Sequence, residues 1–214
     1  MRVQVPLSAQ NRVKMHNLDN KLSGHLAYII GVAIGDGNLS NPTGRSVRLR
    51  ISCNTEYQEI IKEISSSLKI ILPKNKVSYI KRKCKCLDIS SYSKNWEKWL
   101  GWKFDKGPKH KQNINIPEWI KIDPKYSKSC LKGLFQTDGS IYHDRGYIMA
   151  NFVTTIPKLA DEIVEMIKRL GFRPKLYTLS ARDKMRHRKY TIRISIDAAN
   201  FIKAIGFRKD KKII

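Results

Sequence analysis

An internal duplication constrains this chain more than any other feature. The segment IIGVAIGDG at residues 29–37 aligns without a gap on LKGLFQTDG at residues 131–139: glycine is third in both, a small residue is seventh, and Asp-Gly closes both. The similarity reaches the end of each copy, where the matching pairs are Asn95 and Asn200, Lys98 and Lys203, and Gly101 and Gly206. Two long copies are not a solenoid, which needs at least three short stacked repeats. The duplication therefore predicts two similar halves.

Each copy predicts the same order of elements. A polar stretch (38–46 or 140–146) follows the apolar segment and leads into a strand-like run, VRLRIS or YIMANFVT. An amphipathic helix comes next, and two more strand-like runs and a short helix complete the copy. The apolar stripes of the two amphipathic helices are Ile60, Ile61, Ile64 and Leu68, and Leu159, Ile163, Ile167 and Leu170. We expect an α+β fold with the order αββαββα in each copy, which has one strand more than the single run identified before the amphipathic helix.

The expected domain boundaries follow from this order. Residues 1–20 are predicted to be a polar lead-in, 21–101 the first repeat, 102–124 a linker and 125–214 the second repeat. Gly-Pro and Asp-Pro pairs inside 102–124 favour the linker assignment.

Small residues recur on the two apolar segments. The apolar run from Leu26 to Ile34 is too short to span a bilayer, which needs about 20 residues. Glycine costs about 1 kcal/mol against alanine inside a helix, so its repetition indicates a packing role, and small residues four apart let two helix backbones approach closely. We expect the two helices to meet at Gly31, Gly35, Gly133 and Thr137.

Such packing would bring Asp36 and Asp138 side by side at the helix ends. The backbone carbonyls of Gly35 and Thr137 would add oxygen donors there. Carboxylates and carbonyls are the ligands that Mg²⁺ prefers, and a metal so held can activate water and stabilise the leaving oxygen of a phosphodiester. One Asp-Gly alone is more often a helix stop or a turn. Its repetition on two glycine-bearing helices favours a catalytic metal site.

The charge of the chain points to a polyanionic partner. Lys and Arg number 42 against 18 Asp and Glu, a net charge of +24, which is typical of nucleic-acid binding. From charge alone, a structural RNA-binding protein stays an alternative. The candidate DNA contacts lie on predicted strands and hairpins and are Arg48, Arg50, Lys81, Arg82, Lys83, Lys85, Arg182, Lys184, Arg186, Arg188, Lys189 and Arg193.

The paired segments resemble the two motifs of the LAGLIDADG homing endonuclease family in its monomeric, single-chain form, from about Leu22 to Lys212. The resemblance implies two halves related by a pseudo-twofold axis through the motif helices, with saddle-shaped antiparallel sheets along the DNA major groove. It implies double-strand cleavage of a long asymmetric site that leaves short 3′ overhangs. It also implies two or three Mg²⁺ or Mn²⁺ ions at Asp36 and Asp138, and Ca²⁺ that binds without supporting cleavage.

The same resemblance suggests a lysine near the scissile phosphates. By its position after the fourth strand, Lys94 resembles the lysine of the family, and its ungapped counterpart is Ala199. Such a lysine stabilises developing negative charge. Cys53 stands where many family members carry a polar residue.

Two other functions stay open. One is an intron RNA maturase, and the other is a DNA-binding protein with degenerate catalysis. The presence of both aspartates argues against the second. An intein is not expected, because the chain starts at Met1 and ends in Ile213-Ile214. We expect a monomer acting on double-stranded DNA, with intron RNA as a second possible partner and no membrane or protein partner. The expected place is inside a prokaryotic or phage-infected cell, or an organelle.

Overall fold

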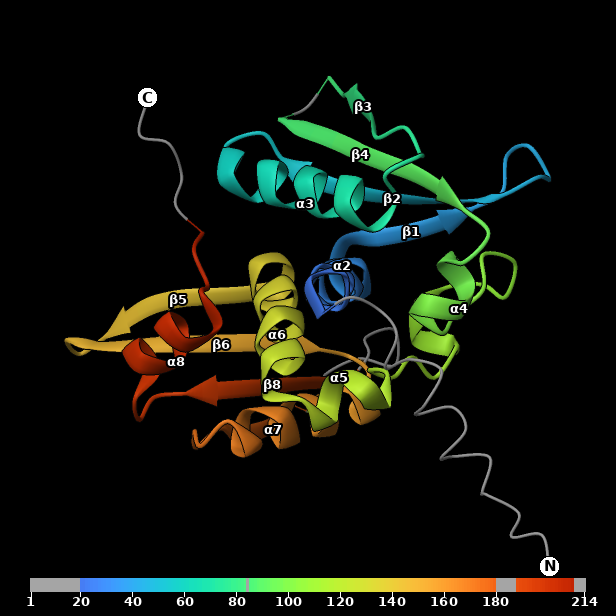
Figure 1. Ribbon diagram of the computed structural model, residues 1–214. Coiled ribbons are helices and arrows are strands. Elements are labelled where there is room, and N and C mark those ends of the chain that lie inside the picture. Colours follow the sequence, from blue (N-terminus) through green and yellow to red (C-terminus); the bar gives the residue numbers. More distant parts are fainter. Residues whose placement is uncertain (1–19, 84, 180–187, 210–214) are drawn as a thin grey trace, which may run out of the picture.

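The computed structural model describes residues 20–83, 85–179 and 188–209 (Figure 1). The first half consists of α2 (Asn20–Asp36), β1 (Gly37–Ser40), β2 (Val47–Asn54), α3 (Gln58–Ile71), β3 (Ser78–Lys81), β4 (Cys86–Ser93) and α4 (Trp96–Leu100). The second half consists of α6 (Pro124–Asp138), β5 (Gly139–Asp144), β6 (Tyr147–Thr154), α7 (Pro157–Arg169), β7 (Lys175–Leu179), β8 (Lys189–Ile194) and α8 (Ala198–Ile205). The α+β class and the order αββαββα are confirmed in both copies.

Each half contains one four-stranded antiparallel sheet. The strand orders are β1-β2-β4-β3 and β5-β6-β8-β7, and the first residue pairs are equivalent, Gly37 with Ile51 and Gly139 with Phe152. The strands β1 and β5 are edge strands of their sheets, and each follows directly on α2 or α6. Both strands begin in stretches where the sequence predicts a polar loop. They are short, and in β1 only Gly37 and Leu39 are buried, so the apolar pattern is too brief to reveal a strand.

One face of each sheet packs on helices and the other is open. Along β2, Leu49 and Ile51 are buried, whereas Arg48 and Arg50 are partly exposed on the opposite face. Residues of a strand alternate between faces, so this pattern places the polar side chains on the open face. The predicted stripes of α3 and α7 lie on the covered face, where Ile64 and Ile163 are fully buried.

The segment predicted as a linker packs into the protein. It contains the 3-10 helix η1 (Lys109–Lys111) and α5 (Glu118–Ile122). Four of its apolar side chains are buried in the core, namely Trp102, Ile114, Ile116 and Ile120. Asp123 and Pro124 start α6 instead of breaking the chain, since the Asp123 side chain accepts a hydrogen bond from the Lys125 backbone N–H.

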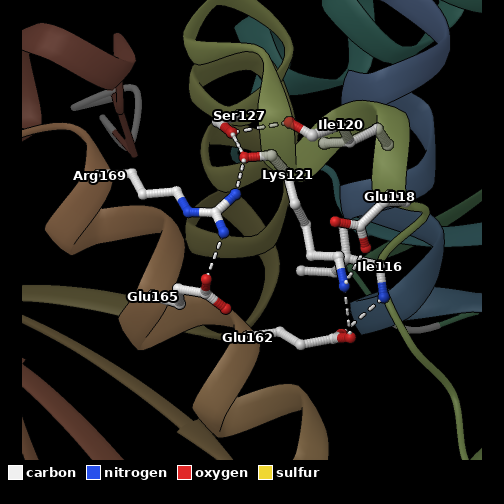
Figure 2. Close-up of polar contacts among 8 residues, drawn as sticks. All are labelled: Ile116, Glu118, Ile120, Lys121, Ser127, Glu162, Glu165 and Arg169. Carbon is white, nitrogen blue, oxygen red and sulfur yellow. Dashed lines mark hydrogen bonds and ion pairs between the residues drawn. The ribbon is translucent and has the colours of Figure 1, made fainter.

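Polar contacts fasten this segment to α7 (Figure 2). The buried Glu162 accepts hydrogen bonds from the backbone N–H of Ile116 at 2.8 Å and from Lys121 Nζ at 3.0 Å. Arg169 donates to the carbonyl of Lys121 at 3.1 Å and pairs with Glu165. The connection between the halves is thereby held against the second half. Within the described ranges, no helix is both long and apolar enough to cross a bilayer.

Candidate active site at the paired helices

The helices α2 and α6 pack backbone to backbone at two glycines. A Cβ added to Gly31 would lie 2.1 Å from the carbonyl oxygen of Cys130, and one added to Gly133 would lie 2.4 Å from that of Tyr28. The four residues are equivalent in the duplication, so the contacts are reciprocal. Only glycine fits at either position, because no side chain tolerates a backbone oxygen at this distance.

The next contact along the pair is asymmetric. A Cβ on Gly35 would lie 2.1 Å from Thr137 Oγ1, so the absence of a side chain on one helix makes room for the threonine of the other. The Thr137 hydroxyl turns back on its own helix and donates to the carbonyl of Leu134 at 2.8 Å. The four small residues predicted at the interface thus lie in contact across it.

A glycine also follows each aspartate for a steric reason. A Cβ on Gly37 would lie 2.5 Å from the carbonyl oxygen of Ala33, and one on Gly139 would lie 2.4 Å from that of Phe135. At these positions the chain leaves the helix and enters β1 or β5 directly. The Asp-Gly pair therefore joins each motif helix directly to an edge strand of its sheet.

The structure brings Asp36 and Asp138 together at the ends of the two helices. A Cβ added to Gly35 on the opposite helix would lie 3.1 Å from Asp138 Oδ2. Both aspartates are exposed residues, although protein atoms surround part of each carboxyl group. This crowding raises the pKa of both groups, and the negative charge of Asp138 raises the pKa of Asp36 further.

Two lysines that the sequence analysis did not select lie at this site. Lys109 Nζ donates to the carbonyls of Ala33, Ile34 and Gly35 at 3.1, 2.8 and 2.6 Å. Lys209 Nζ donates to the carbonyls of Thr137 and Gly139, both at 3.0 Å. Each motif helix therefore ends against one ammonium group, as the dipole of a helix C-terminus favours.

The surroundings of the two ammonium groups are also alike. Lys109 Nζ lies 5.9 Å from the ring centroid of Trp102, and Lys209 Nζ lies 5.8 Å from that of Tyr57. Burial lowers the pKa of Lys109 to about 8, against the opposing attraction of Asp138 and Asp36. Burial lowers the pKa of Lys209 in the same way.

Lys94 does not lie among these groups. It is exposed between β4 and α4, and it makes no hydrogen bond or ion pair with any residue that the structure describes. The cations that act on Asp36 and Asp138 are Lys109 and Lys209. The ungapped alignment of the two copies does not pair Lys109 with Lys209. Lys109 lies in the predicted linker, and the first-copy residue that aligns with Lys209 is Phe104.

The donor set at the helix ends suits a hard cation. Two carboxylates converge there, and the carbonyls of Gly35 and Thr137 each accept one lysine hydrogen bond while keeping a second lone pair. Among the described residues, no three His, Cys, Asp or Glu side chains gather into a metal-binding group. So sparse a protein ligand set fits Mg²⁺, which keeps several waters, and does not fit a structural zinc site.

Cys53 is buried on the core face of β2. Its burial, followed by the charge of Asp36, raises the pKa of the thiol to about 12, so the thiol stays neutral. The register equivalent in the second half is Thr154, whose hydroxyl accepts a hydrogen bond from the backbone N–H of Ile156. The two halves therefore differ in chemistry beside otherwise similar aspartates.

The basic residues predicted to bind DNA occupy different places. Arg48, Arg50 and Arg193 lie on the open faces of the sheets, and Arg82 lies there in a salt bridge with the buried Asp88 at 2.5 Å. Lys81 pairs in register with Leu87, a position of the opposite face, and Lys85 pairs with Glu56 at 2.8 Å. Lys83, Arg188 and Lys189 are exposed, whereas Arg182, Lys184 and Arg186 are outside the described residues.

Comparison with known proteins identifies the duplication. A family model for a LAGLIDADG-like domain matches residues 125–206, and a model for a WhiA LAGLIDADG-like domain matches residues 25–91. The homing endonuclease I-DmoI in complex with DNA and Mn superposes with a TM-score of 0.63 at 22% identity, over 86% of this chain and 97% of that chain. The N-terminal LAGLIDADG domain of DUF199/WhiA superposes with a TM-score of 0.58 at 15% identity, over 97% and 96%.

The curated relatives are much longer proteins. DNA polymerases of Thermococcus sp. (strain GE8) and Thermococcus hydrothermalis are 26% and 24% identical over 90% and 96% of this chain. The matched region is 11% of the first polymerase and 12% of the second, so the chain spans about a tenth of their length. Together the two family models cover the motif helix and most of the following elements in each half. The chain therefore belongs to the LAGLIDADG family, in the form that carries both motifs on a single chain.

Proposed function

We propose that this protein is a metal-dependent homing endonuclease that cuts both strands of double-stranded DNA at a long asymmetric site and leaves short 3′ overhangs. The observation that carries the proposal is the Asp36–Asp138 pair, which is flanked by two lysines and lies where both sheets begin. The likeness of the fold to I-DmoI bound to DNA supports it. The net charge of +24 supports a nucleic-acid partner independently.

A divalent ion would be held by Asp36, Asp138 and the carbonyls of Gly35 and Thr137, and would supply Lewis-acid activation of water and of the phosphodiester. We expect two or three Mg²⁺ or Mn²⁺ ions, and Ca²⁺ that binds without cleavage. Structures of I-DmoI with DNA include Mn, Mg and Ca complexes. Without a cation, the two carboxylates would repel the phosphates of the target.

The lysines supply the remaining chemistry. As ammonium groups aimed by the helix carbonyls, Lys109 and Lys209 would stabilise negative charge that develops on phosphate oxygens. With a pKa of about 8, Lys109 can also release or accept a proton close to neutral pH. Since each half provides one aspartate and one lysine, one set would serve each DNA strand. We assign to Lys109 and Lys209 the role that the sequence suggested for Lys94.

A second candidate is a DNA-binding protein that does not cut. The match of residues 25–91 to the WhiA LAGLIDADG-like domain favours it. The two candidates share the same fold, and cleavage is the activity that separates them.

A cleavage selection distinguishes the two. The protein is incubated with Mg²⁺ and fragmented genomic DNA, and new double-strand ends are sequenced. Asp36→Asn and Asp138→Asn are run in parallel with Asp161→Asn, an exposed aspartate of α7, as the matched control. One dominant cut that is lost in both site variants and kept in the control supports the endonuclease. Selective binding in Ca²⁺ without any cut in Mg²⁺ or Mn²⁺ would establish the second candidate instead.

A further inference from the structure

The open face of the second sheet holds one arginine in a fixed position. Arg193 lies on β8, an inner strand, and its Nη2 donates to the Tyr142 hydroxyl at 2.6 Å. Its Cζ lies 5.9 Å from the ring centroid of Tyr142 on β5 and 5.9 Å from that of Tyr177 on β7. The guanidinium therefore contacts tyrosines from both of the outer strands.

A second hydrogen bond fixes the tyrosine that holds the arginine. Asn151 pairs with Arg193 in the β6–β8 register, and its Nδ2 donates to the Tyr142 hydroxyl at 3.1 Å. Because a hydroxyl that accepts two hydrogen bonds still has one proton to donate, Tyr142 adds a donor beside the arginine. The result is a rigid group of donors in the middle of the sheet.

Among the described residues, the arginines of the first sheet are held differently. Arg48 Nε donates to the Ser40 hydroxyl at 3.1 Å, with no cation–π contact between its guanidinium and a described aromatic ring. There Arg82 is bound to the buried carboxylate of Asp88, which also accepts from Ser52 at 2.7 Å. Arg193 forms no ion pair with any carboxylate in the described part of the chain. Its charge and its remaining N–H groups are left for a ligand.

We infer that Arg193, held by Tyr142 and Tyr177, reads a guanine in the half of the target bound by the second sheet. The inference rests on the proposed function. A fixed arginine fork matches the N7 and O6 acceptors that guanine shows in the major groove. A phosphate contact needs only charge, and the exposed Arg188 and Lys189 provide it at the end of the same strand.

The test is a binding selection with randomised duplex DNA in Ca²⁺, so that cleavage does not distort the counts. The variants are Arg193→Lys, which keeps the charge and loses the fork, and Tyr142→Phe, which keeps the ring and loses the hydroxyl. Arg188→Lys, at the exposed residue just before β8, is the matched control. Circular dichroism and thermal melting establish that each variant is folded.

We expect the wild type to prefer guanine at one position by about 5- to 150-fold, the range of one good bidentate contact. Arg193→Lys should abolish that preference while the other positions of the site stay unchanged, and Tyr142→Phe should weaken it. Arg188→Lys should leave the preference intact. If Arg193→Lys and Tyr142→Phe select the same site as the wild type with the same guanine preference, the inference is wrong although the proposed function stands. If the wild type selects no site, the proposed function fails first.

Discussion

Replacement of Lys109 by Met should separate catalysis from stability. The ammonium donates to three carbonyls at the end of α2, within 2.6 to 3.1 Å. Removal of one preorganised donor from a site of developing negative charge costs about 100- to 1,000-fold in rate. We therefore expect cleavage by Lys109→Met to fall by that factor, with binding of the target in Ca²⁺ little changed.

Stability should respond differently. Burial lowers the pKa of Lys109 from its ordinary 10.5 to about 8, which corresponds to about 3 kcal/mol against the charged form in the folded protein. The variant loses the hydrogen bonds to the carbonyls, which destabilises it, but it also avoids the free-energy cost of the buried charge, which stabilises it. The two effects oppose each other, so at neutral pH the free energy of unfolding should change by less than about 2 kcal/mol.

The pH dependence makes the reasoning testable. Because the folded pKa lies below the unfolded one, the unfolded chain binds more protons between pH 8 and 10.5, and stability from this group rises across that window. Urea denaturation of wild type and Lys109→Met at several pH values should show the wild type gaining up to about 3 kcal/mol relative to the variant. Lys111→Met, at an exposed lysine of η1, is the control and should match the wild type. Parallel pH profiles of wild type and Lys109→Met, or unchanged cleavage by that variant, would refute the argument.

Three further substitutions test the packing and the charges. Gly31→Ala should destabilise the protein by about 3 kcal/mol or more in chemical denaturation, since its Cβ would meet a carbonyl oxygen of the opposite helix at 2.1 Å. Gly24→Ala on the same helix has room for the methyl group, and the same measurement should show stabilisation by up to about 1 kcal/mol. Glu162→Gln removes a buried charge that binds a lysine and a backbone N–H, and it should lower the free energy of unfolding by about 1–3 kcal/mol. Glu165→Gln, on the exposed face of α7, should change the free energy of unfolding by less than about 1 kcal/mol. Asp36→Asn should abolish cleavage and raise the melting temperature of the metal-free protein, because the raised pKa of Asp36 marks a carboxylate whose charge is unfavourable in the folded state. A lower melting temperature would contradict the claim that this charge is unfavourable.

Much of this fold could be predicted from residue patterns. Apart from the first strand of each copy, the order αββαββα follows from periodicities that act over one element at a time, and each element occurs in both copies. The contact of Gly31 with the backbone opposite, and the meeting of Asp36 with Asp138, could be predicted because equivalent residues of two like helices must meet near a pseudo-twofold axis. The strands β1 and β5 escaped the pattern because they are short and mostly polar.

The cations of the site could not be predicted in the same way. Lys109 and Lys209 reach the helix ends from segments that follow α4 and α8, along paths that no periodicity or ungapped alignment describes. Their role depends on burial and on carbonyls far away in the chain. The sequence alone determined which elements form and that two aspartates come together, because those properties are local or repeated. Only the tertiary structure decided which lysines lie beside the aspartates and which arginine is held between two tyrosines, because such contacts arise where distant segments pack.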